Sequence, residues 1–109
     1  MGRKNKYEVR WSLPAIGDLL DIRNHLLADT HSRDLAESSV FRIHVAGENL
    51  SDHPHLWRER NEIASNLRLA PVHPYFICYR VLPNRVEIVR VIHEKRDIIA
   101  MFAEIENRI

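Results

Sequence analysis

Four side chains in the second half of this chain could bind and cleave a phosphodiester: Arg68, Arg80, His93 and Arg96. Metal-free cleavage of RNA needs a base for the 2′-hydroxyl, an acid for the leaving oxygen and cations for the charge on the phosphate. A histidine can move a proton near neutral pH, and arginines can hold the phosphate. These residue types therefore admit an RNA-cleaving site without requiring one.

The same residues have a structural interpretation. His93 closes a strand-like run and could simply hydrogen-bond and orient Asp97 or a backbone carbonyl. Arg68 and Arg80 could pair with Glu62 or Glu87 across a sheet, each contact contributing roughly 0.2–1 kcal/mol. Residue type alone does not choose between these interpretations.

Basic residues gather in one part of the chain, although the net charge is only +1. Residues 57–96 carry eight basic groups against four acidic ones, whereas residues 13–56 carry three basic groups against seven acidic ones. Arginine suits bidentate contacts to phosphate or carboxylate, so the pattern favours an anionic partner, either nucleic acid or an acidic peptide. The eight basic groups are Arg58, Arg60, Arg68, Arg80, Arg85, Arg90, Lys95 and Arg96.

No metal or cofactor site is expected. His53, His55 and His73 are accompanied by no cysteine pair and no His-Glu-x-x-His spacing, and no glycine-rich phosphate loop is present. Cys78, the single cysteine, lies in the most apolar stretch and is expected to be a buried small hydrophobe. One cysteine fits a reducing cytosol.

Length and composition indicate one domain in the cytoplasm. The 109 residues suffice for one modest core, and 45% hydrophobic with 28% charged residues is typical of a globular chain. No apolar run has the length that a bilayer crossing needs, so no membrane contact is expected. Residues 1–6 are basic and polar, which predicts a flexible start rather than a signal peptide, with a single domain over residues 7–109.

Two helices are expected in the first half. Ser12 is a typical helix cap, and apolar residues recur at helical spacing over 15–28, with acidic residues on the other side. A second apolar stripe runs over 36–51, so the two helices should form an antiparallel hairpin. Gly17 and Gly47 could let these helices approach closely, although a glycine inside a helix costs about 1 kcal/mol relative to alanine.

A strand over residues 7–11 precedes this hairpin, and the period of the apolar residues changes from helical to two after residue 57. The expected fold is therefore α+β, a two-layer domain of strand, helical hairpin, three-stranded antiparallel meander and short C-terminal helix. The expected meander strands span 63–69, 75–82 and 86–92, with turns at 71–74 and 82–85, and the last helix spans 98–109.

A set of residues in this order and spacing also resembles a known family, the RelE/ParE superfamily of toxins from type II toxin–antitoxin systems. The ending His93, Arg96 and Asp97 is similar to the ParE branch. The residues that carry the resemblance are Tyr7, Val9, Trp11, Ser12, Ala15, Asp18, Leu19, Ile22, Ala36, Ile43, Leu50, Pro54, Arg68, Pro74, Tyr75, Ile77, Tyr79, Arg80, Val81, Val86, Ile88, Arg90, Val91, His93, Arg96 and Asp97.

The resemblance implies a toxin that a cognate antitoxin, of ribbon-helix-helix type, holds inactive in a hetero-oligomer. It implies one of two targets. ParE-like members are associated with poisoning DNA gyrase, whereas RelE-like members are ribosome-dependent endoribonucleases that cut mRNA. A third interpretation is a non-toxic member that retains only antitoxin binding.

The resemblance favours a gyrase inhibitor over an enzyme. Several nuclease-type members carry a tyrosine in the C-terminal segment, where this chain has Phe102, and no lysine lies between Lys6 and Lys95. We therefore assign no catalytic residue. If the chain were a nuclease, the candidates would be Arg68, Arg80, His93 and Arg96.

The antitoxin interpretation also names residues. A helical hairpin, a basic strand face and a C-terminal helix offer a groove for a partner's amphipathic helix or extended tail. Apolar residues of the hairpin would take the partner's hydrophobic anchors. The arginines expected to meet its acidic groups are Arg58, Arg60, Arg68 and Arg80.

Overall fold

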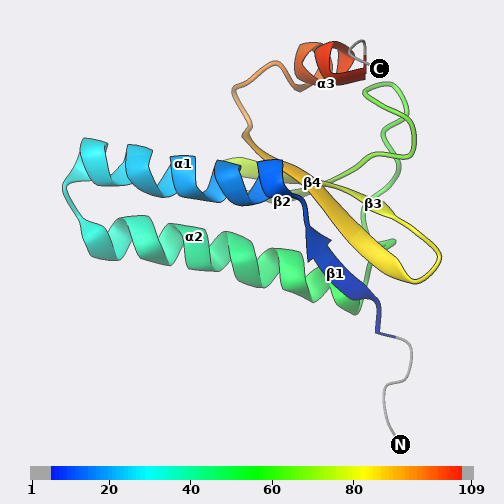
Figure 1. The fold of residues 1–109 in the computed structure, drawn as a ribbon, viewed down its shortest axis with the longest axis horizontal. Coiled ribbons are helices and arrows are strands. Elements are labelled where there is room, and N and C mark those ends of the chain that lie inside the picture. The colour runs from blue at the N-terminus through cyan, green and yellow to red at the C-terminus, as the bar shows by residue number, and fades with distance from the viewer. Residues whose placement is uncertain (1–5, 107–109) are drawn as a thin grey trace, which may run out of the picture.

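In the computed structural model of the chain, which describes residues 6–106, a helical hairpin packs on a four-stranded sheet (Figure 1). Strand order is β1-β4-β3-β2, with β1 parallel to β4 and the other neighbours antiparallel. The predicted α+β order is confirmed, and the parallel β1 makes the whole sheet mixed. The elements are β1 (Glu8–Trp11), α1 (Leu13–Thr30), α2 (Arg33–Glu48), a 3-10 helix (Asn49–Ser51), β2 (Arg68–Val72), β3 (Tyr75–Val81), β4 (Arg85–His93) and α3 (Ile98–Glu106).

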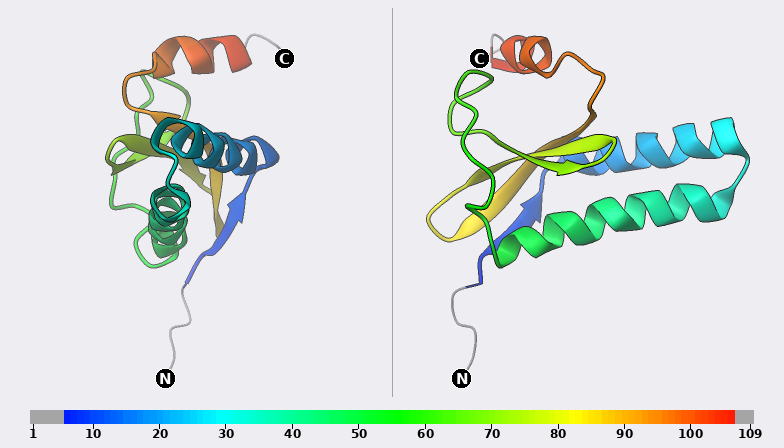
Figure 2. Two further views of the ribbon diagram at one scale, coloured as in Figure 1. Left: turned by 90° about the vertical axis from the view of Figure 1, so that its left-hand side faces the viewer. Right: turned by 180° about the vertical axis from the view of Figure 1, so that it is seen from behind.

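Ser12 fixes the start of the hairpin to the sheet. Its Oγ accepts a hydrogen bond from the backbone N–H of Ala15, at 3.1 Å, and donates one to the carbonyl of Val89, at 2.8 Å. A second serine, Ser32, caps α2 in the same way, after His31 has ended α1 in a left-handed conformation. The predicted hairpin is confirmed, and its tip projects beyond the sheet (Figure 2, right).

Two predicted boundaries of the meander are wrong. The first strand starts at Arg68, not at residue 63, because residues 61–67 form turns in which Asn66 has a φ of 60°. The apolar residues of that segment alternate because they are buried beneath α3, not because they form a strand. The turn expected over 71–74 is shorter, since Pro71 continues β2, an edge strand where a missing N–H is tolerated.

Both faces of the sheet are covered. The hairpin covers one face, and α3 with the turns of residues 61–67 covers the other through Phe102, Leu67 and their neighbours. Cys78 is fully buried on this second side, as predicted, and burial raises the pKa of its thiol to about 12. Residues 107–109 of the predicted last helix lie outside the described residues. Within residues 6–106, no helix combines the length and apolarity needed to span a membrane.

The two helix glycines have different surroundings. A Cβ at Gly47 would lie 2.5 Å from Cζ2 of Trp11 and 2.9 Å from Cδ1 of Ile88. This glycine therefore lets the indole of Trp11, in β1, pack against α2. It does not bring α1 and α2 closer together. A Cβ at Gly17 would meet nothing within 4 Å. The expectation that both glycines bring the helices together is wrong.

Alanine at these positions is expected to have opposite effects. Gly17→Ala should raise the free energy of unfolding by about 1 kcal/mol, because it gains helix propensity in open space. Gly47→Ala should lower it by about 1–3 kcal/mol, because the methyl group displaces Trp11 from a packed site. Urea unfolding of both variants measures this, and a stabilised Gly47→Ala variant would show that the indole shifts without cost.

Candidate partner-binding site

The four arginines predicted to meet an antitoxin lie at one end of β2 and β3. The segment before β2 lies antiparallel to the start of that strand. The backbone N–H of Arg60 donates to the carbonyl of Leu67, and Glu59 forms an isolated β-bridge with Arg68. Arg68 is paired with Tyr79, the neighbour of Arg80. We call Arg58, Arg60, Arg68 and Arg80 the arginine end of the sheet.

Two of these arginines, Arg68 and Arg80, stabilise the local fold of the chain. The Arg68 side chain is only 14% exposed, and its Nη1 donates to the carbonyl of Trp57 at 2.6 Å. Nε of Arg80 donates to the carbonyl of Ser65 at 2.9 Å. Both guanidinium groups thus tie residues 57–67 to the strands, which leaves them little freedom to follow a ligand.

The other two arginines face solvent and share one carboxylate. Nε of Arg60 lies 2.7 Å from Oε2 of Glu62, and Nη2 of Arg58, 71% exposed, lies 3.7 Å from the same atom. The hydrogen bond from Arg60 holds the pKa of Glu62 below its ordinary value. Two positive charges therefore have one negative neighbour. Both arginines border a cavity of about 230 Å³ lined also by Trp57, Leu69, Pro71 and Phe76.

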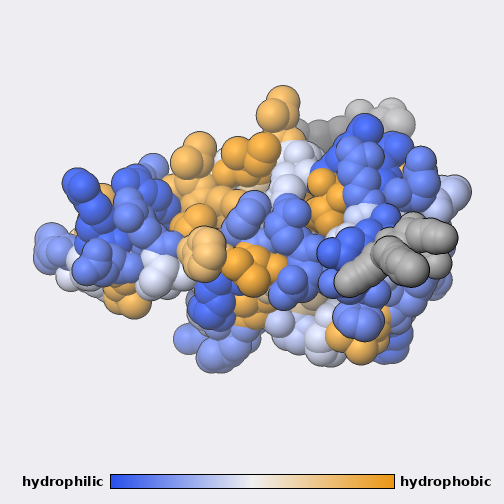
Figure 3. Space-filling view, turned by 90° about the horizontal axis from the view of Figure 1, so that it is seen from below, coloured by the Kyte–Doolittle hydropathy of each residue, from blue (hydrophilic) through white to orange (hydrophobic). Residues whose placement is uncertain are grey.

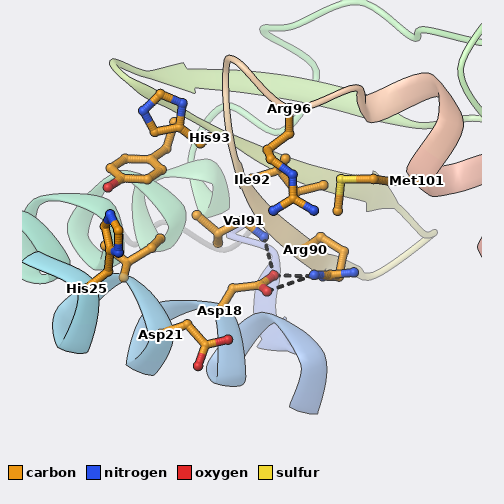
Figure 4. Close-up of a pocket in the computed structure, with 11 residues that line it drawn as sticks. Asp18, Asp21, His25, Arg90, Val91, Ile92, His93, Arg96 and Met101 are labelled. Atoms are coloured by element: carbon orange, nitrogen blue, oxygen red, sulfur yellow. Dashed lines mark hydrogen bonds and ion pairs between the residues drawn. The ribbon is translucent and has the colours of Figure 1, made fainter.

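The remaining two candidates, His93 and Arg96, line a larger cavity of about 520 Å³, which we call the α1–α3 cavity (Figure 4). It is separate from the arginine end. His93 pairs with Tyr75 at one end of β3, and Arg80 lies five residues along that strand, roughly 16 Å at 3.3 Å per residue. The structure therefore does not bring the four nuclease candidates together.

Asp18 organises one wall of this cavity. Its carboxylate accepts from Nε of Arg90 at 2.7 Å, from Nη2 of the same arginine at 2.8 Å and from the backbone N–H of Val91 at 2.8 Å. The pairing of β1 with β4 ends at Ile88, so Asp18 satisfies a donor on the strand edge that β1 leaves uncovered. The hydrogen bond to Asp18 raises the pKa of Arg90. Sequence reasoning missed this contact, which joins residues 72 positions apart.

His93 is held at the cavity by two contacts. Its Nδ1 accepts the backbone N–H of Lys95 at 3.1 Å, and its ring stands edge-on to Tyr75 with the ring centres 5.3 Å apart. The histidine therefore does bind a backbone group, although an N–H and not the carbonyl suggested by the sequence. Phe102 is 1% exposed and packs from α3 into the core on the side of the sheet that α3 covers.

The histidines considered as metal ligands are dispersed. His55 packs edge-on to Tyr7, while Nδ1 of His73 lies 3.0 Å from Oε1 of Glu94. Over residues 6–106, no group of three or more histidine, cysteine, aspartate and glutamate side chains could hold a metal ion.

The outer face of the hairpin carries apolar side chains. Seen from below, apolar residues gather over the hairpin between polar ones (Figure 3). A helix normally turns such residues to the core, so large ones left exposed indicate a surface for contact with another molecule. The exposed large apolar residues of α1 and α2 are Leu13, Ile16, Leu20, Leu35, Phe41 and Val45.

Two solved structures from bacterial toxin–antitoxin systems have a similar fold. One, a chromosomal ParDE system from P. aeruginosa, superposes with a TM-score of 0.72 at 18% identity, covering 83% of this chain and 98% of that one. Another, the toxin–antitoxin complex RelBE2 from Mycobacterium tuberculosis, has a TM-score of 0.56 at 23% identity, covering 81% and 98%. These likenesses establish a RelE/ParE-type fold.

The sequence itself defines the family more narrowly. Residues 9–98 match the family model described as the ParE toxin of the type II toxin–antitoxin system parDE. The chain belongs to this ParE toxin family, which confirms the predicted ParE-like branch of the superfamily. No curated protein sequence matches it.

Proposed function

We propose that this chain is a growth-inhibiting toxin of the cytoplasm that a ribbon-helix-helix antitoxin neutralises in a hetero-oligomer. The observation that carries the antitoxin part is the arginine end, where Arg58 and Arg60 share Glu62 beside an apolar cavity. An acidic antitoxin segment with an apolar side chain fits this combination. The toxin–antitoxin complexes among the similar structures support such a partner.

The four arginines of the arginine end would have different roles in antitoxin binding. Arg68 and Arg80 already donate to backbone carbonyls of residues 57–67, so they would shape the surface. Arg58 and Arg60 would supply the charge that meets the antitoxin. The exposed apolar residues of the hairpin offer a second area of contact, for the hydrophobic anchors of an amphipathic antitoxin helix.

The target we propose is DNA gyrase, which the toxin would inhibit by binding. The ParE family membership supports this choice over mRNA cleavage. Two structural observations point the same way: the four nuclease candidates lie in two separate groups, and Phe102 is enclosed in the core.

Pulse labelling tests the target. After brief induction in bacteria that lack the antitoxin, incorporation of thymidine and of methionine is followed in the same culture. We expect DNA synthesis to fall first, together with DNA-damage signalling, and mRNA to stay intact. An earlier fall in protein synthesis with new mRNA ends would assign the chain to the nuclease class. If neither falls, the chain keeps at most its antitoxin partner.

The antitoxin surface gives a second prediction. Arg58→Ala with Arg60→Ala should weaken antitoxin binding by roughly tenfold to a hundredfold, because charge-assisted hydrogen bonds contribute about 1.5–3 kcal/mol each and part of this is screened. Calorimetric titration with the purified antitoxin at two salt concentrations measures the loss. The control is Arg10→Ala, whose arginine pairs with Glu8 on the opposite edge strand. Equal affinity of the double variant and the wild type would exclude these arginines from the interface.

A further inference from the structure

The α1–α3 cavity contains a cation, Arg96, that contacts no carboxylate of the described residues. Figure 4 shows the Arg96 side chain directed into the cavity, toward Arg90. Among residues 6–106, no hydrogen bond or ion pair engages its guanidinium group. Two guanidinium groups therefore face one space.

The nearest carboxylate does not serve Arg96. Both oxygens of Asp18 are engaged, by two nitrogens of Arg90 and by the backbone N–H of Val91. Asp21 lines the same cavity, but its carboxylate points away from Arg96 (Figure 4). The two aspartates and two arginines of the lining balance in charge, but only Arg90 has a carboxylate in direct contact, so a ligand carboxylate would give Arg96 the contact it lacks.

Four residues of the lining are aliphatic or thioether side chains. They are Ile22, Val91, Ile92 and Met101, so a ligand must bring an apolar group together with its negative one. A cavity of about 520 Å³ has room for two side chains of ordinary size. An acidic residue beside an apolar one in a peptide provides both groups.

The negative groups of α1 argue against a nucleic acid here. Asp18 and Asp21 line the cavity on the side of α1, and a strand of RNA or DNA would bring several phosphates against them. The two histidines of the lining are already engaged: His25 with Asp29, and His93 with the N–H of Lys95. One free guanidinium suits a single carboxylate.

We propose that the α1–α3 cavity is a second antitoxin-binding subsite, which takes one acidic side chain on Arg96 and an adjacent apolar side chain against Met101 and Ile92. The inference rests on the proposed antitoxin partnership and adds a subsite distinct from the arginine end. Asp21 sets a limit on the ligand, because a second acidic group near the mouth of the cavity would be repelled.

The test uses the full chain and two blocked peptides, Ala-Leu-Glu-Leu-Ala and Ala-Leu-Gln-Leu-Ala, with the Met101 methyl resonance as the reporter. We expect the glutamate peptide to bind about tenfold more tightly than the glutamine peptide, and Arg96→Met to remove the difference. Arg96→Lys should retain part of it, and Asp21→Asn should strengthen binding of the glutamate peptide. The control Arg10→Ala, which removes an arginine paired with Glu8 on β1, should change neither. Equal binding of the two peptides, or a Met101 shift caused by an RNA oligonucleotide and not by either peptide, would overturn the subsite.

The cognate antitoxin separates this inference from the proposed function. If wild type and Arg96→Met both bind it with equal affinity, the subsite is wrong and the antitoxin partnership stands. If the wild type does not bind it at all, the partnership itself fails. A roughly tenfold weaker complex for Arg96→Met, additive with the loss at Arg58 and Arg60, would support two separate subsites.

Discussion

Replacing Asp18 with alanine is expected to lower the free energy of unfolding by about 3–5 kcal/mol. The carboxylate is 12% exposed and accepts from the guanidinium of Arg90 and from the N–H of Val91. Its removal leaves a half-buried cation and a strand-edge donor without a partner. The melting temperature should fall by roughly 10 °C or more, because each kcal/mol shifts a domain of this size by several degrees.

Urea unfolding monitored by tryptophan fluorescence measures this loss, since Trp11 packs against the main core. Glu8→Ala is the matched control: its ion pair with Arg10 is exposed on both sides and should contribute less than about 0.5 kcal/mol. The double variant Asp18→Leu with Arg90→Met should recover a large part of the loss, because it removes both charges. A loss of under 1 kcal/mol for Asp18→Ala would show that water solvates Arg90 adequately.

Local patterns in the sequence predicted the elements that depend on local physics. Ser12 marks the start of α1 because a side-chain oxygen must satisfy a free N–H there, and this requirement is visible in the sequence. The long apolar run of β3 is visible for a similar reason, since a central strand is buried on both faces. Element order therefore followed from cap residues and periodicity.

Features that depend on distant contacts could not be predicted in this way. Apolar residues over 61–67 alternate as a strand does, yet their burial comes from α3, some 35 residues later. Asp18 looked like any acidic residue on the polar side of a helix until the end of β1 placed it beside β4. The role of Gly47 was equally hidden, because its close neighbour is the indole of β1.

The candidate site also has features that the sequence predicts and features that only the fold shows. That Arg58, Arg60, Arg68 and Arg80 belong to one arginine-rich part of the chain was foreseeable from charge composition alone. It was not foreseeable which of these arginines bind backbone groups of the chain. The carbonyls bound by Arg68 and Arg80 belong to turns that have no sequence pattern. The α1–α3 cavity combines three separate parts of the chain, so only the fold could reveal it.

Phe102→Ala should show how α3 is attached to the sheet. The phenyl ring is almost fully enclosed, and truncating such a residue costs about 3–5 kcal/mol when the surrounding structure stays in place. α3 reaches the second core only through Phe102, Ile98 and Met101. The packing of α3 on the sheet has its own free energy. If this free energy is smaller than the cost of the cavity, α3 will detach before a cavity forms. The global free energy of unfolding will then fall by less than about 3–5 kcal/mol.

Hydrogen exchange distinguishes these two results. Detachment predicts that amides of α3 lose nearly all protection in Phe102→Ala while those of β4 keep most of theirs, because the hairpin side of the sheet is packed independently. A cooperative loss predicts faster exchange in both. Ile99→Ala is the control on the same helix, since Ile99 is 56% exposed and its truncation should cost under about 0.5 kcal/mol. Because Met101 lines the α1–α3 cavity, detachment would also open that cavity and weaken the acidic peptide at Arg96, even with the arginine unchanged.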